Sequence, residues 1–422
     1  MAEKNTRLVR SWVIVVIVTI IISGLWIVCG EDNGSMASYA VGINASAVNV
    51  TRMDDAGTRS DCFSSIFAFG DSQTDTGNAV SAFPSRFSSP QAYPYGMSYF
   101  TSSPDRYCDG RLFIDFMAQA AGLSLVHPYL KGFGANFASG ANFAVVGATA
   151  QNTSFITPFH IGVQVDWFRR FKSNVDTAVS SGVIMQGIRG DGYFQDGLYI
   201  INIGGNDIIN ALLGDRNSTR VLDNIRSQLP LIANRTLDVI QELYDEGARR
   251  FFIQNIPPTG CNPATLTMLS NPYTEYDMLG CIRPINNVIQ SYGYILQDGI
   301  NTLRRRNQDG LFIYGDYFGL VYSILERHSE FGFNQTTQNC CGVGGFYNFD
   351  MLIRCGQTGV LNGRTVEADP CDNPSTYIFW DGIHFTEAAN RVIAQQFLDG
   401  FYVNPSNALR LLCDFDMSII RK

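Results

Sequence analysis

Ser72 is the first residue of the chain whose setting suggests chemistry. It lies in Ile66–Ala79, IFAFGDSQTDTGNA, where apolar residues lead directly into a Gly-Asp-Ser turn. A serine hydroxyl is unreactive at neutral pH unless a base accepts its proton, so a nucleophilic Ser72 requires a histidine. Among the four histidines, only His384 follows an aspartate, Asp381, by three residues. This spacing lets the carboxylate accept the imidazole Nδ1–H and fix the tautomer.

The other histidines are weaker candidates for the base. His127 and His160 have no acidic residue close in sequence, and His328 lies in ERHSEF, which is typical of a solvated helix end. A D-x-x-H pair is by itself a weak signal, because a core or capping histidine is the more common explanation.

Two glycine-containing segments supply the donors that acyl transfer needs. Backbone N–H groups of Ser72 and Gly147, together with the side-chain amide of Asn206, would stabilise a developing oxyanion. Glycine at position 147 permits a close backbone approach, and Gly204 and Gly205 permit the tight turn that presents Asn206.

The elements that must position these residues alternate between strands and helices. Short apolar runs typical of strands buried on both faces occupy Ile66–Phe69, Leu198–Ile203, Phe251–Ile256 and Leu311–Tyr314. Helical patterns occupy Leu112–Ala121, Val221–Tyr244 with an interruption at Pro230, and Ile285–Arg306. The alternation predicts a doubly wound α/β fold with a parallel sheet.

Ligands of such folds bind beyond the carboxyl ends of the strands. Phe69 and Ile203 each lead into one of the polar loops described above, so both loops should open onto one crevice. Asp381 and His384 stand just before a helix that Thr386 is expected to N-cap.

Four segments, in this order, resemble the conserved blocks of the GDSL (SGNH) hydrolases, and the plant GDSL esterase/lipase family fits best. They are FAFGDSQTDTGNA, NFAVVGATA, INIGGNDI and WDGIHFTEAAN. The segments DRYCDGRLFIDFMAQAAGL, HPYL, NIPPTGCNP and CCGVGGFYNF agree with that family as well. The resemblance covers roughly residues 62–402 and is specific in combination.

The resemblance implies a role for each matching residue. Ser72 would be the nucleophile, His384 the general base and Asp381 its orienting acid, with Gly147 and Asn206 joining Ser72 in the oxyanion hole. The implied fold is a three-layer α/β/α sandwich with a parallel central sheet, flavodoxin-like rather than α/β-hydrolase. The serine accordingly lies in G-D-S and not in a G-x-S-x-G turn. No cofactor is implied.

The N-terminus predicts entry into the secretory pathway. Three basic residues precede an apolar run, Trp12–Cys29, which indicates a signal peptide over residues 1–30. The alternative is a retained signal anchor, which is the only predicted membrane contact. Residues 31–61 read as a polar, mobile leader, 62–402 as the hydrolase domain, and 403–422 as an additional tail without an assigned function.

Cysteines and glycosylation sites agree with an extracellular location. Sequons occur at Asn33, Asn44, Asn49, Asn152, Asn217, Asn234 and Asn334. Nine of the ten cysteines would remain after removal of the signal peptide, which contains Cys29, so at least one is free or intermolecular and the others are expected in disulfides. No C-x₂-C pair is present, which argues against a zinc site. The family resemblance places the protein in the cell wall or apoplast.

The expected partner is a small or polymeric ester, and no nucleic acid. The formal net charge is −8, with acidic and basic residues interspersed, so the chain carries no basic footprint for phosphate backbones. The sequence predicts a secreted serine esterase or lipase. Two alternatives stay open: an acyltransferase using the same residues, and a catalytically silent cell-wall binding protein.

Overall fold

The structure is a computed structural model that describes residues 25–32, 35–42, 62–101, 104–153, 155–185, 187–188, 192–214 and 220–421. The chain divides into two compact units, Met1–Cys62 and Phe63–Lys422. In the first unit, strand β1 (Leu25–Asp32) pairs antiparallel with β2 (Ser35–Gly42). The first 24 residues of the predicted signal peptide lie outside the described residues.

The second unit is built on a six-stranded sheet with the order β12-β7-β6-β5-β3-β4. Its strands are β3 (Ile66–Gly70), β4 (Gly140–Asn142), β5 (Leu198–Asn202), β6 (Arg250–Gln254), β7 (Leu311–Gly315) and β12 (Val403–Asn404). Only the pairing of β12 with β7 is antiparallel; the other neighbours run parallel. The predicted α/β class with a mostly parallel sheet is therefore correct.

The central strands are buried on both faces, which explains their uninterrupted apolar sequences. In β6, Phe251 stacks on Phe312 of β7 with ring centroids 5.0 Å apart. Its neighbour Phe252 points to the opposite face and contacts Phe113 and Phe397 at 5.9 and 5.2 Å. Successive side chains of a strand alternate between faces, so a strand covered by helices on both sides needs apolar residues at every position.

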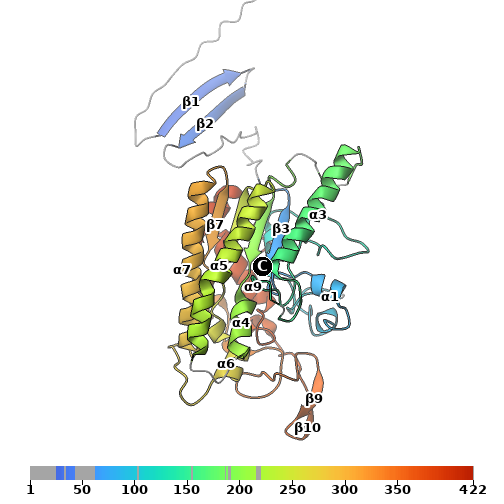
Figure 1. Cartoon of the computed structure of the whole chain (residues 1–422), viewed down its shortest axis with the longest axis vertical. Helices are drawn as coiled ribbons and strands as arrows, with labels where there is room; N and C mark the ends of the chain where they lie inside the picture. Colours follow the sequence, from blue (N-terminus) through green and yellow to red (C-terminus); the bar gives the residue numbers. More distant parts are fainter. Residues whose placement is uncertain are drawn as a thin grey trace, which may run out of the picture. The chain divides into compact units, whose positions relative to one another are not determined.

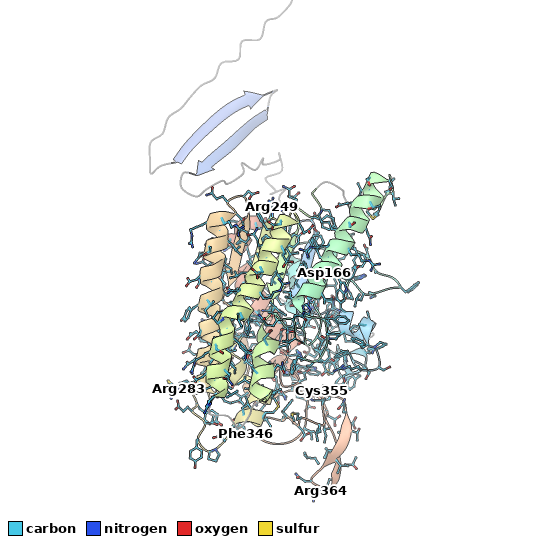
Figure 2. All side chains as sticks on the ribbon, viewed as in Figure 1. Asp166, Arg249, Arg283, Phe346, Cys355 and Arg364 are labelled. Atoms are coloured by element: carbon cyan, nitrogen blue, oxygen red, sulfur yellow. A yellow bond between two sulfur atoms is a disulfide. The ribbon has the colours of Figure 1, made fainter. Side chains whose placement is uncertain are left out.

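Helices form a layer on each face of the sheet (Figure 1). One layer contains α3 (Ile161–Ser180), α4 (Gly205–Gly214), α5 (Val221–Asp245) and α7 (Arg283–Arg306), with α5 packed along α7. The other contains α2 (Phe113–Ala120) packed against α9 (Glu387–Leu398), and α9 also contacts α8 (Tyr317–Glu326) and α10 (Ala408–Leu412). Figure 2 shows the side chains of this unit filling the space between ribbons.

One predicted helix continues where the sequence suggested an interruption. Helix α5 runs through Pro230 without a break. Proline removes one backbone donor, which leaves the carbonyl of Arg226 without its helical partner. Because Pro230 and Arg226 are both exposed, water can hydrate that carbonyl and the helix tolerates the proline.

Smaller elements surround the sheet edge where the strands end. They are α1 (Asn78–Ala82), α6 (Pro263–Leu269), and the strands β8 (Gln335–Asn339), β9 (Thr358–Leu361), β10 (Arg364–Glu367) and β11 (Tyr377–Phe379). Four short 3₁₀ turns lie at Ser89–Gln91, Thr259–Cys261, His328–Phe331 and Pro374–Thr376. β11 pairs parallel with β8, and β9 with β10 forms a hairpin.

Disulfides account for all the described cysteines from Cys62 onward except Cys108. Three bonds join Cys261 to Cys281, Cys340 to Cys371 and Cys341 to Cys355. Cys62 and Cys413 are likewise disulfide-bonded cysteines, and Cys108 is the free, buried thiol of the described chain. The odd cysteine expected from the sequence is thus Cys108.

The tail after residue 402 packs onto the second unit. Strand β12 extends the sheet, Ile420 is fully buried, and the Phe415 ring lies 6.1 Å from that of Phe63.

Asn152, Asn234 and Asn334 are exposed, as their predicted glycosylation requires, whereas Asn33, Asn44, Asn49 and Asn217 fall outside the described residues. Within the described ranges, no helix combines the length and apolar character needed to cross a bilayer.

Candidate active site

Three residues predicted to act together lie in one hydrogen-bonded chain. His384 Nε2 is 2.8 Å from Ser72 Oγ, and His384 Nδ1 is 2.8 Å from Asp381 Oδ1. Ser72 and His384 are 8% and 7% exposed, so both side chains are buried. With Nδ1–H bonded to the carboxylate, Nε2 is left as the acceptor for the serine proton.

Ser72 is fixed by the way β3 ends. The Gln164 side chain of α3 donates to the Gly70 carbonyl at 2.8 Å and accepts from the Gly70 N–H at 2.9 Å. A Cβ atom at position 70 would lie 2.4 Å from the Asn202 carbonyl oxygen of β5, so only glycine permits this approach. The chain then turns at once, which places Ser72 beyond the carboxyl end of the strand.

His384 and Asp381 lie between β11 and α9. The Trp380 N–H donates to the His384 carbonyl at 2.7 Å, closing the loop that contains both residues. Helix α9 begins after Thr386, whose hydroxyl accepts from Ala389 N at 3.1 Å and donates to the Tyr377 carbonyl at 2.7 Å. The predicted N-cap is therefore confirmed, and it also ties the helix to β11.

Gly147 adopts a backbone conformation that favours glycine. Its φ is +72°, and a Cβ atom there would lie 2.5 Å from Ile156 Cβ. The segment before it is held against the Ser72 loop, because Val145 N donates to the Gly70 carbonyl at 3.1 Å and Val146 N to the Asp75 carboxylate at 3.0 Å. Neither Ser72 N–H nor Gly147 N–H donates to another described backbone group. Both remain available to a ligand.

Asn206 lies in the first turn of α4 and contacts the Gly147 segment. Its Nδ2 donates to the Ala148 carbonyl at 2.9 Å, which orients the amide. A primary amide has two donor hydrogens, so a second one is left for a ligand. Position 205 is close to the Ser72 turn as well, since a Cβ there would be 3.7 Å from Asp71 Oδ2.

Asp207 lies in the first turn of α4 but bonds a different segment rather than the backbone of the following helix. Its carboxylate instead accepts from Ala150 N at 2.7 Å and from Gln151 N at 3.0 Å. The residue therefore joins α4 to the segment after Gly147. Asn206 and Asp207 together hold the start of α4 against the segment that follows Gly147.

Buried carboxylates surround the site. The Asp75 carboxylate accepts the backbone N–H groups of Gly77, Asn78 and Ala79 as well as that of Val146. Burial raises the pKa of Asp71 to about 6, against the opposing effects of the Gln73 N–H and the charge of His384. At pH 7 Asp71 is therefore mostly ionised and adds negative potential near His384.

The remaining histidines have structural partners away from Ser72. His127 Nδ1 accepts from Asn136 N at 2.7 Å, and His160 Nδ1 accepts from Gly162 N at 3.2 Å at the start of α3. His328 Nδ1 lies 2.8 Å from the Phe333 carbonyl. Across the described part of the chain, no group of three or more His, Cys, Asp or Glu residues is arranged to hold a metal ion.

The site contains two tyrosines, Tyr95 and Tyr107, that the sequence alone did not identify as site residues. Tyr95 donates its hydroxyl to Asp381 Oδ2 at 2.8 Å, and the Tyr107 ring lies 5.1 Å from the His384 ring. Tyr95 belongs to an aromatic-rich stretch, residues 83–100, in which ordinary core aromatics are the usual explanation. Only the fold brings it to Asp381, 286 residues away.

The chain matches an ester-hydrolase family over most of its length. A family model, the GDSL-like Lipase/Acylhydrolase, matches residues 66–397. The chain therefore belongs to the GDSL-type esterase/lipase family of carboxylic ester hydrolases.

Plant proteins are similar over most of the chain. A GDSL esterase/lipase of Arabidopsis thaliana is 34% identical, covering 83% of this chain and 91% of its own length. GDSL esterase/lipase ACHE of Zea mays is 35% identical over 86% of this chain and 92% of its own. The solved phospholipase A1 of Streptomyces albidoflavus aligns with 68% of this chain and 91% of its own, at 11% identity and a TM-score of 0.33.

Proposed function

We propose that this protein is a secreted serine esterase that hydrolyses carboxylic esters through an acyl-enzyme on Ser72. The observation that carries the proposal is the continuous chain from Ser72 Oγ through the His384 imidazole to Asp381, with both links at 2.8 Å. A binding protein has no need of this arrangement.

In the first step, His384 Nε2 takes the proton of Ser72 as Oγ attacks the ester carbonyl carbon. The tetrahedral oxyanion accepts hydrogen bonds from Ser72 N–H, Gly147 N–H and the second Asn206 Nδ2 hydrogen. Collapse breaks the ester bond, and His384 returns the proton to the leaving alcohol. Asp381 holds the imidazole in the required tautomer and stabilises its protonated form.

In the second step, water replaces the alcohol. His384 removes one proton from water, the hydroxide attacks the acyl carbon, and the same donors stabilise the second tetrahedral intermediate. The carboxylic acid leaves, and Ser72 recovers its proton from His384. No cofactor takes part in these steps.

Secretion is supported by the disulfides, by the plant relatives and by the predicted signal peptide. Disulfides form and persist in oxidising compartments and are rare in the cytosol. We place the protein in the cell wall or apoplast, acting on a small or polymeric ester.

The test is hydrolysis of short-chain and long-chain p-nitrophenyl esters by the purified protein. We expect turnover in the wild type and a loss of at least about 10³-fold in Ser72→Ala. Ser85→Ala, which changes an exposed serine, is the matched control and should keep full activity. A folded wild type that hydrolyses no ester, and whose Ser72 is not labelled by a fluorophosphonate, would overturn the proposal in favour of a silent binding protein.

A further inference from the structure

Asp381 receives a hydrogen bond from outside its own loop. Its Oδ1 accepts from His384 Nδ1 at 2.8 Å and from the backbone N–H of His384 at 3.1 Å. Its Oδ2 is 2.9 Å from His384 Nδ1 and accepts the Tyr95 hydroxyl at 2.8 Å. The phenol is therefore the one donor to this carboxylate, among described residues, that does not come from residues 381–384.

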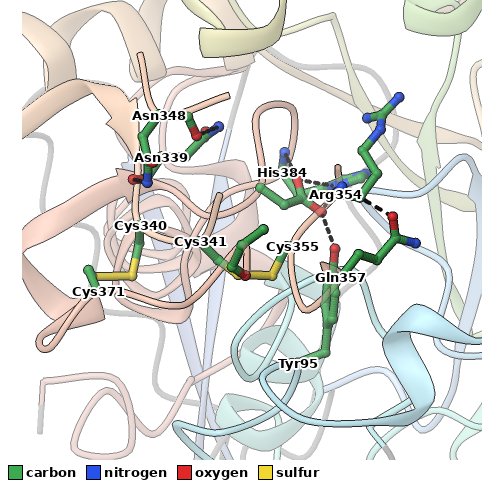
Figure 3. The surroundings of a disulfide bond; sticks show 12 residues. Tyr95, Asn339, Cys340, Cys341, Asn348, Arg354, Cys355, Gln357, Cys371 and His384 are labelled. Atoms are coloured by element: carbon green, nitrogen blue, oxygen red, sulfur yellow. Dashed lines mark hydrogen bonds and ion pairs between the residues drawn. A yellow bond between two sulfur atoms is a disulfide. The ribbon is translucent and has the colours of Figure 1, made fainter. Parts of the chain in front are cut away.

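Tyr95 is held rigidly in a buried aromatic and cysteine cluster. The residue is 5% exposed, and its ring packs edge-on against Tyr107 and Trp380 with centroids 5.7 and 6.0 Å away. The same cluster contains Cys340, Cys341 and Cys355. Figure 3 shows the Tyr95 side chain beside the Cys341–Cys355 disulfide, on the side facing His384.

Residues 340–356, which contain the Cys341–Cys355 bond and are called the disulfide segment here, also hold the Asp381 loop. Cys340 N donates to the Phe379 carbonyl at 3.0 Å, and Cys341 N donates to the Trp380 carbonyl at 2.8 Å. The Gly356 backbone lies against the Tyr95 segment, since a Cβ there would be 2.8 Å from Pro94 Cδ. The disulfide segment thus lies against both partners of the Tyr95–Asp381 bond.

The charges around this bond favour a neutral phenol and an ionised carboxylate. Burial raises the pKa of the Tyr95 hydroxyl well above its ordinary value, and the nearby Asp381 charge acts in the same direction. Burial alone would raise the pKa of Asp381, but the His384 charge and the hydrogen bonds from His384 and Tyr95 outweigh it. Arg354 and Tyr107 are the other titratable groups that act on Tyr95.

From these contacts we infer that Tyr95 is a positioning residue of the catalytic site, which holds Asp381 in the orientation that directs the His384 imidazole toward Ser72. This inference rests on the proposed function, because it assigns Tyr95 to the same Ser72 site. The phenol fixes Oδ2, so it sets the direction in which the His384 imidazole points.

The principal test compares Tyr95→Phe with Tyr377→Phe. The first keeps the ring and removes the bond, leaving Oδ2 without its phenol partner. Tyr377 packs against the same cluster, and its hydroxyl has no partner in the described part of the chain, so it is the matched control. We expect kcat/KM to fall by about tenfold to a hundredfold in Tyr95→Phe, with KM nearly unchanged. Tyr377→Phe should resemble the wild type.

A pH profile separates positioning from simple destabilisation. Without the phenol, the Asp381 charge is less dispersed and attracts the protonated imidazole more strongly, so the acidic limb of kcat/KM should move to higher pH. Replacing Tyr95 by 3-fluorotyrosine, a more acidic donor, should move the limb to lower pH while keeping the ring in place. An unchanged limb in both variants, or an equal shift in Tyr377→Phe, would overturn the inference.

A spectroscopic measurement distinguishes failure of the inference from failure of the proposed function. The His384 Nδ1 proton, followed by NMR in protein labelled with ¹⁵N-histidine, reports the bond to Asp381 without any ester turnover. Its resonance should shift in Tyr95→Phe and stay fixed in Tyr377→Phe. If the wild type hydrolyses no ester but this shift occurs, the proposed function fails and the positioning role stands. If the wild type is active and no shift occurs, the positioning role fails alone.

Discussion

At the scale of single residues, the site combines free donors with fixed acceptors. The Ser72 and Gly147 N–H groups make no backbone hydrogen bond within the described residues, whereas the carboxylates of Asp75 and Asp207 accept four and two backbone N–H groups of other residues. Donors held in advance at the place where charge develops need no reorganisation during the reaction. The polar groups around Ser72 therefore divide into those that hold the loops and those left for a ligand.

Asn206 provides a direct test of that division. We expect Asn206→Ala to lower kcat by about 10²–10³-fold, because it removes one oxyanion donor while the other two remain. The measurement is the turnover of a p-nitrophenyl ester, with circular dichroism to establish folding. Asn210→Ala, one turn further along α4, should leave kcat unchanged. Undiminished turnover in a folded Asn206→Ala protein would remove Asn206 from the site.

At the scale of elements, the proposed catalytic residues occupy the ends of strands and the beginnings of helices. Ser72 follows β3, Asn206 lies in the first turn of α4 after β5, and His384 precedes α9. Parallel strands bring their carboxyl ends to one edge of the sheet, so each βα loop contributes to the same crevice. The precision of the site thus depends on how each helix begins.

Thr386 tests this dependence for α9. Its hydroxyl bonds both Ala389 N and the Tyr377 carbonyl and is fully buried. We expect Thr386→Ala to be less stable than Thr386→Ser by about 1–2 kcal/mol in the free energy of unfolding, measured by urea denaturation. The serine variant lacks only the methyl group, so the difference between the two isolates the hydroxyl. Equal stability of both variants would show that the cap contributes nothing.

At the scale of the whole molecule, disulfides fix the segments around the site. The Cys340–Cys371 and Cys341–Cys355 bonds lie in the stretch that leads to Asp381, and Cys108 stays free and buried. Several disulfides in one chain are typical of proteins that fold in an oxidising compartment. The number of free thiols therefore reports whether residues 1–30, which contain Cys29, have been removed.

We therefore expect one thiol per secreted chain. Maleimide should label the denatured, unreduced protein once, at Cys108, and should not label the native protein, because this thiol is buried. The Cys108→Ser variant should take up no label, and intact mass should place the mature N-terminus near residue 31. A chain that retains residues 1–30, with Cys29 present, would contradict the removal of a signal peptide.

The sequence by itself predicted the fold class and the family, and it singled out Ser72, Asp381 and His384, which the fold brings into one hydrogen-bonded chain. Strands buried on both faces leave continuous apolar runs, and the glycines at positions 70, 147 and 204 stand where a side chain would collide or the backbone must turn. Each of these constraints limits the residue type at a single position, so it is visible in the sequence. The prediction of an interrupted helix at Pro230 was wrong because exposure, which local sequence does not specify, let the helix continue.

Only the tertiary structure decided which distant residues meet. Tyr95 reaches Asp381 across 286 positions, and Asp207 bonds the backbone of Ala150 rather than capping its own helix. It also decided which cysteines pair and which one stays free. These contacts depend on how loops pack at the edge of the sheet, and packing between segments far apart in the chain leaves no periodic pattern in either of them.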